Sequence, residues 1–440
     1  MFRLRRAFAI VAVIVAGIGC GKAIPPKPES ERLMQLAHNA FDRRDLDEAI
    51  ARAGEAIHLE PKTEIYVFRA GVYLFKEDRT RALADLDEAV RLDPKSLRAH
   101  DHRASILSLR DRHAEAIVSL NEVLKLKPDW VERWRDRAEA HRLTKNYPQA
   151  LADYTEAIRL DPKEKRTFIE RAIIHHLMDD EKAAVEDFTA ALKLDPADLV
   201  AYNLRGQSHA TLNNFPAALA DLNRVVEADP LDAKTLVVRG KVYMAMKNSS
   251  AAVADYTRAI ELDSGEAEYY RLRGMARSPQ QSREMLADFD RAVKLAPFNF
   301  GGYMLRSAAR FVDGQHDAAL RDLGEAIDIQ PGASEGYHRR GDLLLIMKRY
   351  EEALADYNTA LSITPDADAL RNRAECLMKL KRFDEARADL DGSLKLDPNN
   401  PLTYAARARL FFREPAKTGT KQNSPRSEDP AAKEPAVDKR

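Results

Sequence analysis

A helix-terminating proline recurs along most of this 440-residue chain at a nearly constant interval. Successive occurrences lie 33 or 34 residues apart, and most of them follow a hydrophobic residue and a polar residue. The eleven positions of the series are Pro61, Pro94, Pro128, Pro162, Pro196, Pro230, Ser264, Pro297, Pro331, Pro365 and Pro398. A period of roughly 20–50 residues is typical of repeat architectures, in which each unit buries its apolar face only by stacking on its neighbours.

Small and apolar residues recur in register with this proline, and they predict a pair of helices in each unit. When the proline is numbered 32, position 8 is Ala, Gly or Ser in every unit, and position 20 is Ala in ten of the eleven. Position 24 carries a large side chain in many units, as at Leu86, Tyr154, Phe188, Tyr256, Phe289 and Tyr357. Small residues let two helices cross closely, and the large ones recur at the spacing of one helix face. The proline then ends the second helix, because it lacks the N–H that a helix interior needs.

The whole pattern resembles the tetratricopeptide repeat, and the resemblance covers residues 30–413. It implies an all-α fold, an α-α superhelix in which about eleven helix pairs form a right-handed solenoid. A lone helix over 401–412 follows the last pair and resembles the cap that a stacked array needs over its final apolar face. The eighth unit departs from the pattern, since we expect Ser278 and Pro279 to cut its first helix short and Met285 replaces the small residue at position 20.

The N-terminus resembles a bacterial lipoprotein export signal. Three arginines precede an apolar run of thirteen residues, 7–19, and Cys20 follows it. This run is shorter than the roughly 20 residues that span a bilayer, and it fits the hydrophobic region of a signal peptide. The resemblance implies that Cys20 is lipidated, although Gly17 stands where the lipidation motif prefers a large aliphatic residue. An ordinary cleaved signal with a chance cysteine is the alternative.

These features divide the chain into four segments. We expect a signal peptide at 1–19, a proline-rich tether at 20–29, the solenoid at 30–413 and a disordered tail at 414–440, where prolines and charged residues stand among almost no bulky side chains. A lipidated export signal predicts a protein of the bacterial cell envelope, anchored to a membrane with its solenoid facing the periplasm. A soluble periplasmic or secreted protein is the alternative.

Arginine and aspartate also follow the repeat. Position 7 is Arg in every unit after the first and in the lone helix: Arg69, Arg103, Arg137, Arg171, Arg205, Arg239, Arg273, Arg306, Arg340, Arg373 and Arg407. Position 23 is Asp in nine units: Asp85, Asp153, Asp187, Asp221, Asp255, Asp288, Asp322, Asp356 and Asp389. We expect each guanidinium to bridge a carboxylate within or between repeats, because such pairs are geometrically selective. Anion binding is the functional alternative.

No constellation of catalytic residues stands out in the sequence. It contains no Gly-rich phosphate loop, no Gly-x-Ser-x-Gly elbow and no Cys-x-x-Cys pair, so we expect neither an enzyme nor a cofactor. Lys plus Arg and Asp plus Glu are equal at 70 each, which argues against a nucleic-acid partner. Cys376 has no neighbouring histidine and is interpreted as a small core residue.

Three histidines share position 11 of consecutive repeats: His141, His175 and His209. Neighbouring repeats should place equivalent atoms about 8–10 Å apart, the spacing of packed helices. A zinc ion holds its nitrogen ligands at about 2 Å, so a shared metal site would be strained and we expect none. We interpret the imidazoles as replacements for Tyr at the helix packing. A pH-sensitive stretch and a metal site are the alternatives.

The resemblance also implies where a partner would bind, because in this family positions 2, 5, 9 and 12 of the first helix line a concave groove. In the middle repeats these positions are mostly apolar with a few amides, and exposed apolar area of this kind usually marks a binding surface. The residues that we expect to contact a partner are Ile169, Ile173, Asn203, Gln207, Val237, Lys241, Met244, Met304 and Phe311. Packing between neighbouring first helices is the alternative for any one of them.

The sequence therefore predicts a non-catalytic protein–protein interaction scaffold, tethered through Cys20, that holds a peptide or protein in its groove. An accessory or assembly subunit of a cell-envelope complex, acting by stacking or self-association, is the alternative. Neither a nucleic acid nor a small-molecule substrate is expected as a ligand.

Overall fold

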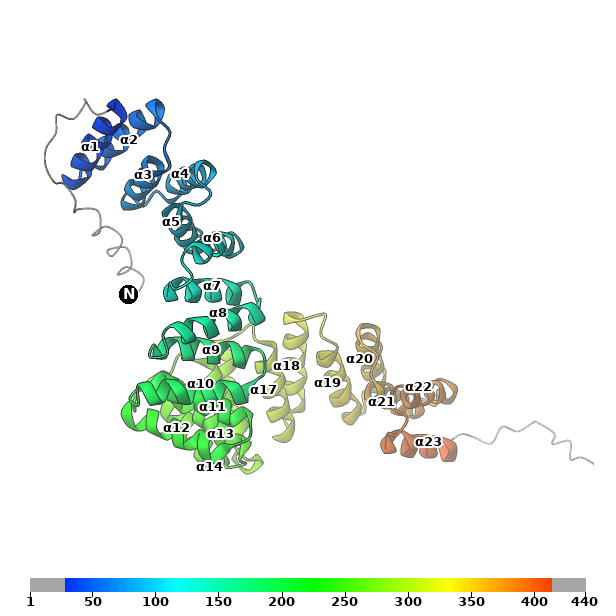
Figure 1. The fold of residues 1–440 in the computed structure, drawn as a ribbon. Coiled ribbons are helices and arrows are strands. Elements are labelled where there is room, and N and C mark those ends of the chain that lie inside the picture. The colour runs from blue at the N-terminus through cyan, green and yellow to red at the C-terminus, as the bar shows by residue number, and fades with distance from the viewer. Residues whose placement is uncertain (1–27, 414–440) are drawn as a thin grey trace, which may run out of the picture. The chain divides into compact units, whose positions relative to one another are not determined.

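A computed structural model describes residues 28–413, and every regular element in this range is helical (Figure 1). The predicted signal peptide, Cys20 and the predicted tail lie outside the described residues. The chain divides into two compact units, Met1–Ala228 and Asp229–Arg440.

The helix bounds within the described residues follow the predicted repeat. The first unit contains α1 (Glu29–Asp42), α2 (Leu46–Leu59), α3 (Thr63–Phe75), α4 (Arg79–Leu92), α5 (Leu97–Leu109), α6 (His113–Leu126), α7 (Val131–Leu143), α8 (Tyr147–Leu160), α9 (Lys165–Leu177), α10 (Glu181–Leu194), α11 (Leu199–Thr211) and α12 (Phe215–Ala228). The second unit contains α13 (Ala233–Ala245), α14 (Ser249–Leu262), α15 (Ala267–Ala276), the 3₁₀ helix η2 (Pro279–Gln281), α16 (Ser282–Leu295), α17 (Phe300–Val312), α18 (His316–Ile329), α19 (Ser334–Ile346), α20 (Tyr350–Ile363), α21 (Ala367–Lys379), α22 (Phe383–Leu396) and α23 (Pro401–Arg413).

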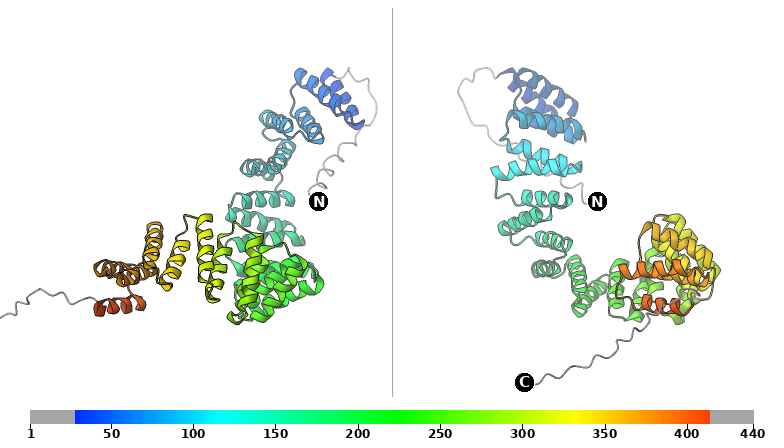
Figure 2. Two further views of the ribbon diagram at one scale, coloured as in Figure 1. Left: turned by 180° about the vertical axis from the view of Figure 1, so that it is seen from behind. Right: turned by 90° about the vertical axis from the view of Figure 1, so that its right-hand side faces the viewer.

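Consecutive helices pack against each other in sequence order within each unit (Figures 1 and 2). Each odd-numbered helix from α1 to α21, called helix A, pairs with the even-numbered helix that follows it, called helix B. Each helix B of a unit then packs against the next helix A of that unit. Over residues 28–413 this arrangement confirms the predicted all-α solenoid of eleven helix pairs and a closing helix, α23.

The turn between helix A and helix B has one backbone conformation in ten of the repeats. The residue at position 15 has a positive φ in each of them, and the N–H of the next residue donates to the carbonyl of position 11, as from Asn146 to His141 at 2.8 Å. This bond is the signature of a Schellman motif, which satisfies carbonyls that the end of a helix would otherwise leave unpaired. Gly314 is the only glycine at this position, so the other nine turns hold an L-residue in the left-handed region.

The small residue at position 8 lies against the large residue at position 24 of the same repeat. A Cβ atom built on Gly240 would lie 2.5 Å from the ring of Tyr256, and one built on Gly341 would lie 2.9 Å from the ring of Tyr357. Both rings are fully buried. The pattern of small residues in the sequence therefore marks the closest approach of helix A to helix B.

Hydrogen bonds also connect the repeats at the proline position. The indole N–H of Trp134, at position 4, donates to the carbonyl of Pro128 at 2.8 Å, and the Tyr404 hydroxyl donates to the carbonyl of Pro398 at 3.0 Å. A polar tip at position 4 thus connects helix A to the end of the preceding helix B.

The arginines and aspartates form a ladder of ion pairs inside the repeats. In nine repeats the guanidinium at position 7 makes a bidentate contact with the aspartate at position 23, with Nη2–Oδ1 distances of 2.6–2.8 Å. All nine aspartates are buried. The predicted pairing is confirmed, and its two parallel hydrogen bonds give it the geometric selectivity of a fork-to-fork contact.

Most of these guanidinium groups have a second arm, which reaches the helix B of the preceding repeat. Arg137 Nη1 donates to Asn121 Oδ1 at 2.8 Å, and Arg171 Nη1 donates to Thr155 Oγ1 at 3.1 Å. Arg103, whose own repeat has Ser119 at position 23, bonds to Asp87 of the preceding repeat at 2.6 Å. Each such arginine therefore stabilises both the fold of its own repeat and the stacking on the repeat before it.

The eighth repeat has the predicted irregularity. Its helix A, α15, has 10 residues, three fewer than the other described helices A of the second unit, and η2 follows it at Pro279. The ladder adapts, because Arg273 pairs with Asp288 fifteen residues later and Arg277 joins the same carboxylate at 2.8 Å. Within the described residues this is the one repeat whose A–B connection has no residue with positive φ.

Candidate functional site

The predicted groove residues of the first unit lie on α9 and α11 and are half-buried. Ile169 packs against buried residues of α10, α11 and α12, including Leu192 and Val225. Gln207 Nε2 donates to Asn203 Oδ1 at 2.6 Å, so these amides already form a hydrogen bond with each other. The side chain of Ile169 therefore mainly fills space between neighbouring repeats, as the packing alternative expects.

The predicted groove residues of the second unit differ more widely in exposure. Val237 keeps only 7% of its surface exposed, and Met304 packs against the buried cluster that contains Leu323 and Leu343. Met244 is half-buried. Lys241 and Phe311 are exposed, with Lys241 Nζ 3.9 Å from a carboxylate oxygen of Glu268 and the Phe311 ring 5.3 Å from that of His316. The two exposed side chains are therefore the best placed of this set to contact a partner.

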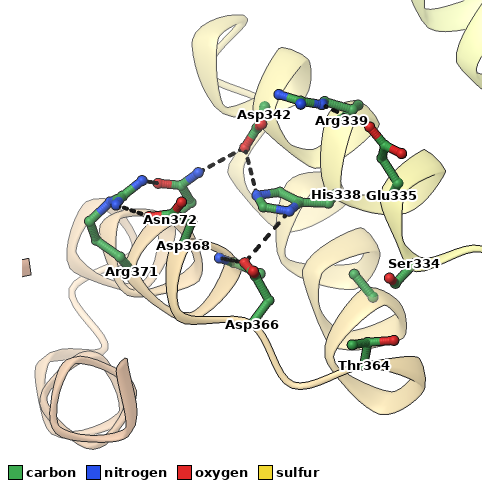
Figure 3. A pocket seen from close by; sticks show the side chains of 12 residues that line it. Ser334, Glu335, His338, Arg339, Asp342, Thr364, Asp366, Asp368, Arg371 and Asn372 are labelled. Atoms are coloured by element: carbon green, nitrogen blue, oxygen red, sulfur yellow. Dashed lines mark hydrogen bonds and ion pairs between the residues drawn. The ribbon is translucent and has the colours of Figure 1, made fainter. Parts of the chain in front are cut away.

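A polar pocket of about 450 Å³ lies on the helix A side of repeats ten and eleven (Figure 3). Glu335, His338 and Asp342 come from positions 2, 5 and 9 of α19, and Asp368 and Arg371 from positions 2 and 5 of α21. The pocket thus uses the positions that the sequence assigned to the groove, in the two repeats that directly follow the region predicted to bind. The sequence could have indicated this pocket, because positions 2, 5 and 9 of α21 are as polar as those of α19.

His338 lies between two carboxylates inside this pocket, as Figure 3 shows. Its Nε2 is 3.6 Å from Asp342 Oδ1 on the same helix, and its Nδ1 is 3.7 Å from Asp366 Oδ1 at the start of α21. Asp342 also accepts hydrogen bonds from the Tyr357 hydroxyl and from Asn372 Nδ2, both at 2.8 Å. Burial, followed by the neighbouring Asp342, raises the pKa of Tyr357 well above its usual range, so the phenol stays a donor.

The pocket carries an excess of negative charge. Its lining holds four carboxylates (Glu335, Asp342, Asp366 and Asp368) and two guanidinium groups (Arg339 and Arg371), which leaves two negative charges when His338 is neutral. Arg371 pairs with Asp368, and Arg339 lies 3.8 Å from Glu335. The arrangement favours a ligand group that is positively charged and donates hydrogen bonds.

The three histidines of the predicted series lie beside the ion-pair ladder. His141 Nε2 is 4.0 Å from Asp153, and His175 Nε2 is 3.8 Å from Asp187. Burial lowers the pKa of His141 and His209 more than the adjacent aspartate raises it, so both imidazoles are neutral near pH 7. Because unfolding would restore the ordinary pKa, protonation below about pH 6.5 favours the unfolded chain.

A cysteine, possible metal ligands and possible membrane helices are the remaining candidate features of residues 28–413. Cys376 is fully buried, as predicted for a small core residue, and burial raises the pKa of its thiol to about 12. In this range no group of three or more His, Cys, Asp or Glu side chains is placed to hold a metal ion. None of the helices described there is both long and apolar enough to cross a membrane.

The stacked helix pairs, the close contact between positions 8 and 24 and the closing helix define a helical-repeat protein. Models of the tetratricopeptide repeat match residues 69–130, 131–164, 182–233, 233–265 and 344–410. The chain therefore carries tetratricopeptide repeats, and together with its fold they make it a tetratricopeptide-repeat solenoid.

Solved structures that are similar to this chain show low sequence identity to it. A tetratricopeptide repeat protein from Parabacteroides merdae is 19% identical over 56% of this chain and 98% of its own, with a TM-score of 0.38. Yeast Tom70 is 19% identical over 87% of this chain and 88% of its own, with a TM-score of 0.42. YrrB, described as having an unusual peptide-binding site, is 18% identical over 41% of this chain and 92% of its own, with a TM-score of 0.36. A comparison with curated protein sequences gave no match.

Proposed function

We propose that this protein is a non-catalytic protein–protein interaction scaffold that binds a peptide or an extended protein segment on its helix A surface. The acidic pocket of α19 and α21 carries the proposal, because it gathers polar side chains of two repeats around one cavity. Its excess of carboxylates suits the Lys or Arg side chain of a bound segment. The exposed Lys241 and Phe311 supply further contact sites on the same unit.

The first test is site-specific photo-crosslinking of the full chain in cells. One probe is placed at the exposed position 339 of α19, beside the pocket, and a control probe at the exposed position 321 of α18, a helix B. The probe at 339 should capture a protein partner that the probe at 321 does not. Replacing Asp366 by Asn and Glu335 by Gln should then reduce the adduct roughly tenfold, since hydrogen bonds to charged groups contribute about 1.5–3 kcal/mol. Asn at 366 can still cap α21, so this change removes charge with little change in fold.

The matched control is the pair Asp45→Asn and Glu88→Gln, which removes one cap charge and one partly exposed helix B charge from the first unit. This pair should leave the adduct unchanged. Equal adducts from positions 339 and 321, or an adduct insensitive to the Asp366 and Glu335 changes, would contradict binding at the pocket.

We further propose that the scaffold is tethered to a bacterial envelope membrane through a lipidated Cys20, as the N-terminal sequence predicts. Cys20→Ser should abolish labelling by an alkyne-tagged fatty acid and move the protein from the membrane fraction to the soluble fraction. Cys376→Ser serves as the matched control, because this buried thiol should have no part in anchoring. Labelling that persists in Cys20→Ser would rule out the anchor.

A further inference from the structure

The closing helix α23 is half of a repeat, a helix A for which residues 28–413 provide no helix B. It covers the last complete repeat by packing against α21 and α22. In all eleven complete repeats the small residue at position 8 is buried beneath the helix B of the same repeat, whereas its equivalent in α23, Ala408, is exposed. The face of α23 that would receive a helix B is therefore open.

The open face has the residue types that bind a helix B elsewhere in the chain. Tyr404, Ala408 and Phe411 occupy positions 4, 8 and 11, and the tyrosine and phenylalanine remain 52% and 76% exposed. The same positions of complete repeats are covered, as at Tyr202, Ala374 and Leu377. Aromatic side chains are enriched at the buried cores and hot spots of protein interfaces.

Arg407 at position 7 shows what charge the missing helix should carry. Its equivalent Arg373 pairs with the buried Asp389 of its own helix B and is 22% exposed, whereas Arg407 is 53% exposed. Within residues 28–413, Arg407 contacts only Asp391 of the preceding repeat, at 3.5 Å. Arg407 therefore has its contact with the preceding repeat, but the described residues supply no carboxylate equivalent to Asp389 for it to pair with.

Neither this chain's tail nor a second copy fits the face. Among residues 414–440 the only large apolar side chain is Val437, and Gly419 and Pro425 interrupt the stretch where a helix B would lie. Every helix B described in residues 28–413 already packs against its own helix A, so a second copy could offer only another α23. That pairing would bring together two copies of α23, each of which contains three arginines and no acidic residue, so their charges would repel.

We propose that α23 is a docking site for one amphipathic helix of a partner protein, seated as a helix B. The partner helix should carry a small residue, an acidic residue three positions later, an aromatic residue or Leu directly after it, and a second small residue three positions further on. This is the pattern of α20, where Ala353, Asp356, Tyr357 and Ala360 are all buried and Asp356 pairs with Arg340 of α19. The partner's acidic residue would pair with Arg407, and its aromatic residue would pack on Ala408 between Tyr404 and Phe411.

The test uses a peptide with the sequence of α20, residues 350–363, stapled on its outward face because a free helix of this length is marginal in water. Fluorescence anisotropy of the labelled peptide with the full chain should show saturable binding that a scrambled peptide lacks. Ala408→Arg fills the exposed face without touching the core and should weaken binding at least tenfold, the effect of losing a central anchor.

A charge exchange tests the orientation of the docked helix. A peptide in which the residue equivalent to Asp356 is Lys should bind at least tenfold more weakly, and Arg407→Glu in the protein should restore its binding. Circular dichroism melting of each variant confirms an intact solenoid. Absence of peptide binding, or binding unaffected by Ala408→Arg, overturns the proposal. So does sedimentation of the wild-type chain as a dimer that Ala408→Arg converts to a monomer, because the face would then belong to a second copy.

Discussion

At the residue scale, the arginine at position 7 is the most repeated polar determinant of this fold. It neutralises a buried aspartate in its own repeat and, in most repeats, hydrogen-bonds to the one before. A buried carboxylate without its partner is costly, because the protein interior does not replace the solvation that water provides. The ladder therefore contributes to stability chiefly because each arginine keeps a buried aspartate from being left unpaired.

The first prediction compares two rungs of this ladder. Arg205→Leu strands the buried Asp221 and should lower the free energy of unfolding by roughly 3 kcal/mol. Arg103→Leu should cost no more than about 1 kcal/mol, because its partner Asp87 is half-exposed and its own repeat offers only Ser119. Urea denaturation followed by circular dichroism measures both. Equal losses in the two variants would mean that carboxylate burial is not the controlling term.

At the element scale, the distance between helix A and helix B is set by position 8. Gly240 brings α13 against the buried ring of Tyr256, whereas Gly324 in α18 has open space where its Cβ would be. The two glycines therefore occur in helices for different reasons, the first for close packing and the second without a steric requirement.

Alanine substitution should separate these two cases. Gly240→Ala should lower the free energy of unfolding by about 1 kcal/mol, because the overpacking cost outweighs the gain in helix propensity. Gly324→Ala should raise it by up to about 1 kcal/mol, since only the propensity gain applies. Thermal and urea unfolding of the two variants provide the measurement. Stabilisation by Gly240→Ala would show that α13 and α14 can separate at little cost.

At the scale of the whole molecule, the proline period and the small residues were sufficient to predict the helix pairs and the closing helix, and Ser278 and Pro279 predicted the shortened α15. The intra-repeat ion pairs were predicted because their two partners recur at fixed positions. The repeat pattern left open whether a bridge lies within or between repeats. The acceptors of the inter-repeat arm change from Asn121 to Thr155 to Asp290, so no repeated residue type marks that arm. The left-handed turns were missed, since nine of the ten such residues are not glycine.

The candidate site was harder to predict than the fold. A hydrophobic residue at position 5 can face a ligand or fill the gap to a neighbouring repeat, and Ile169 shows the second outcome. Exposure depends on the shapes of the surrounding side chains, which the repeat pattern does not specify, so Val237 and Phe311 could not be separated in advance. The pocket at His338 depends on contacts between two repeats, which appear only once the helices are stacked.

Two arginines of the described ladder make no hydrogen bond to the preceding repeat, and one of them, Arg340, lies in the second unit. Within residues 28–413, Arg340 hydrogen-bonds only to Asp356, because Gly324 stands where other repeats supply an acceptor. Arg69 likewise faces Gly54, which has no side-chain acceptor. Repeats that share fewer contacts separate more readily, since a solenoid is held together by nearest neighbours. Under mechanical load α19–α23 should therefore detach as one block from the rest of the second unit. A partner that pulls on α23 would then separate α19–α23 from α18 first. This separation would keep the remaining repeats of the second unit folded.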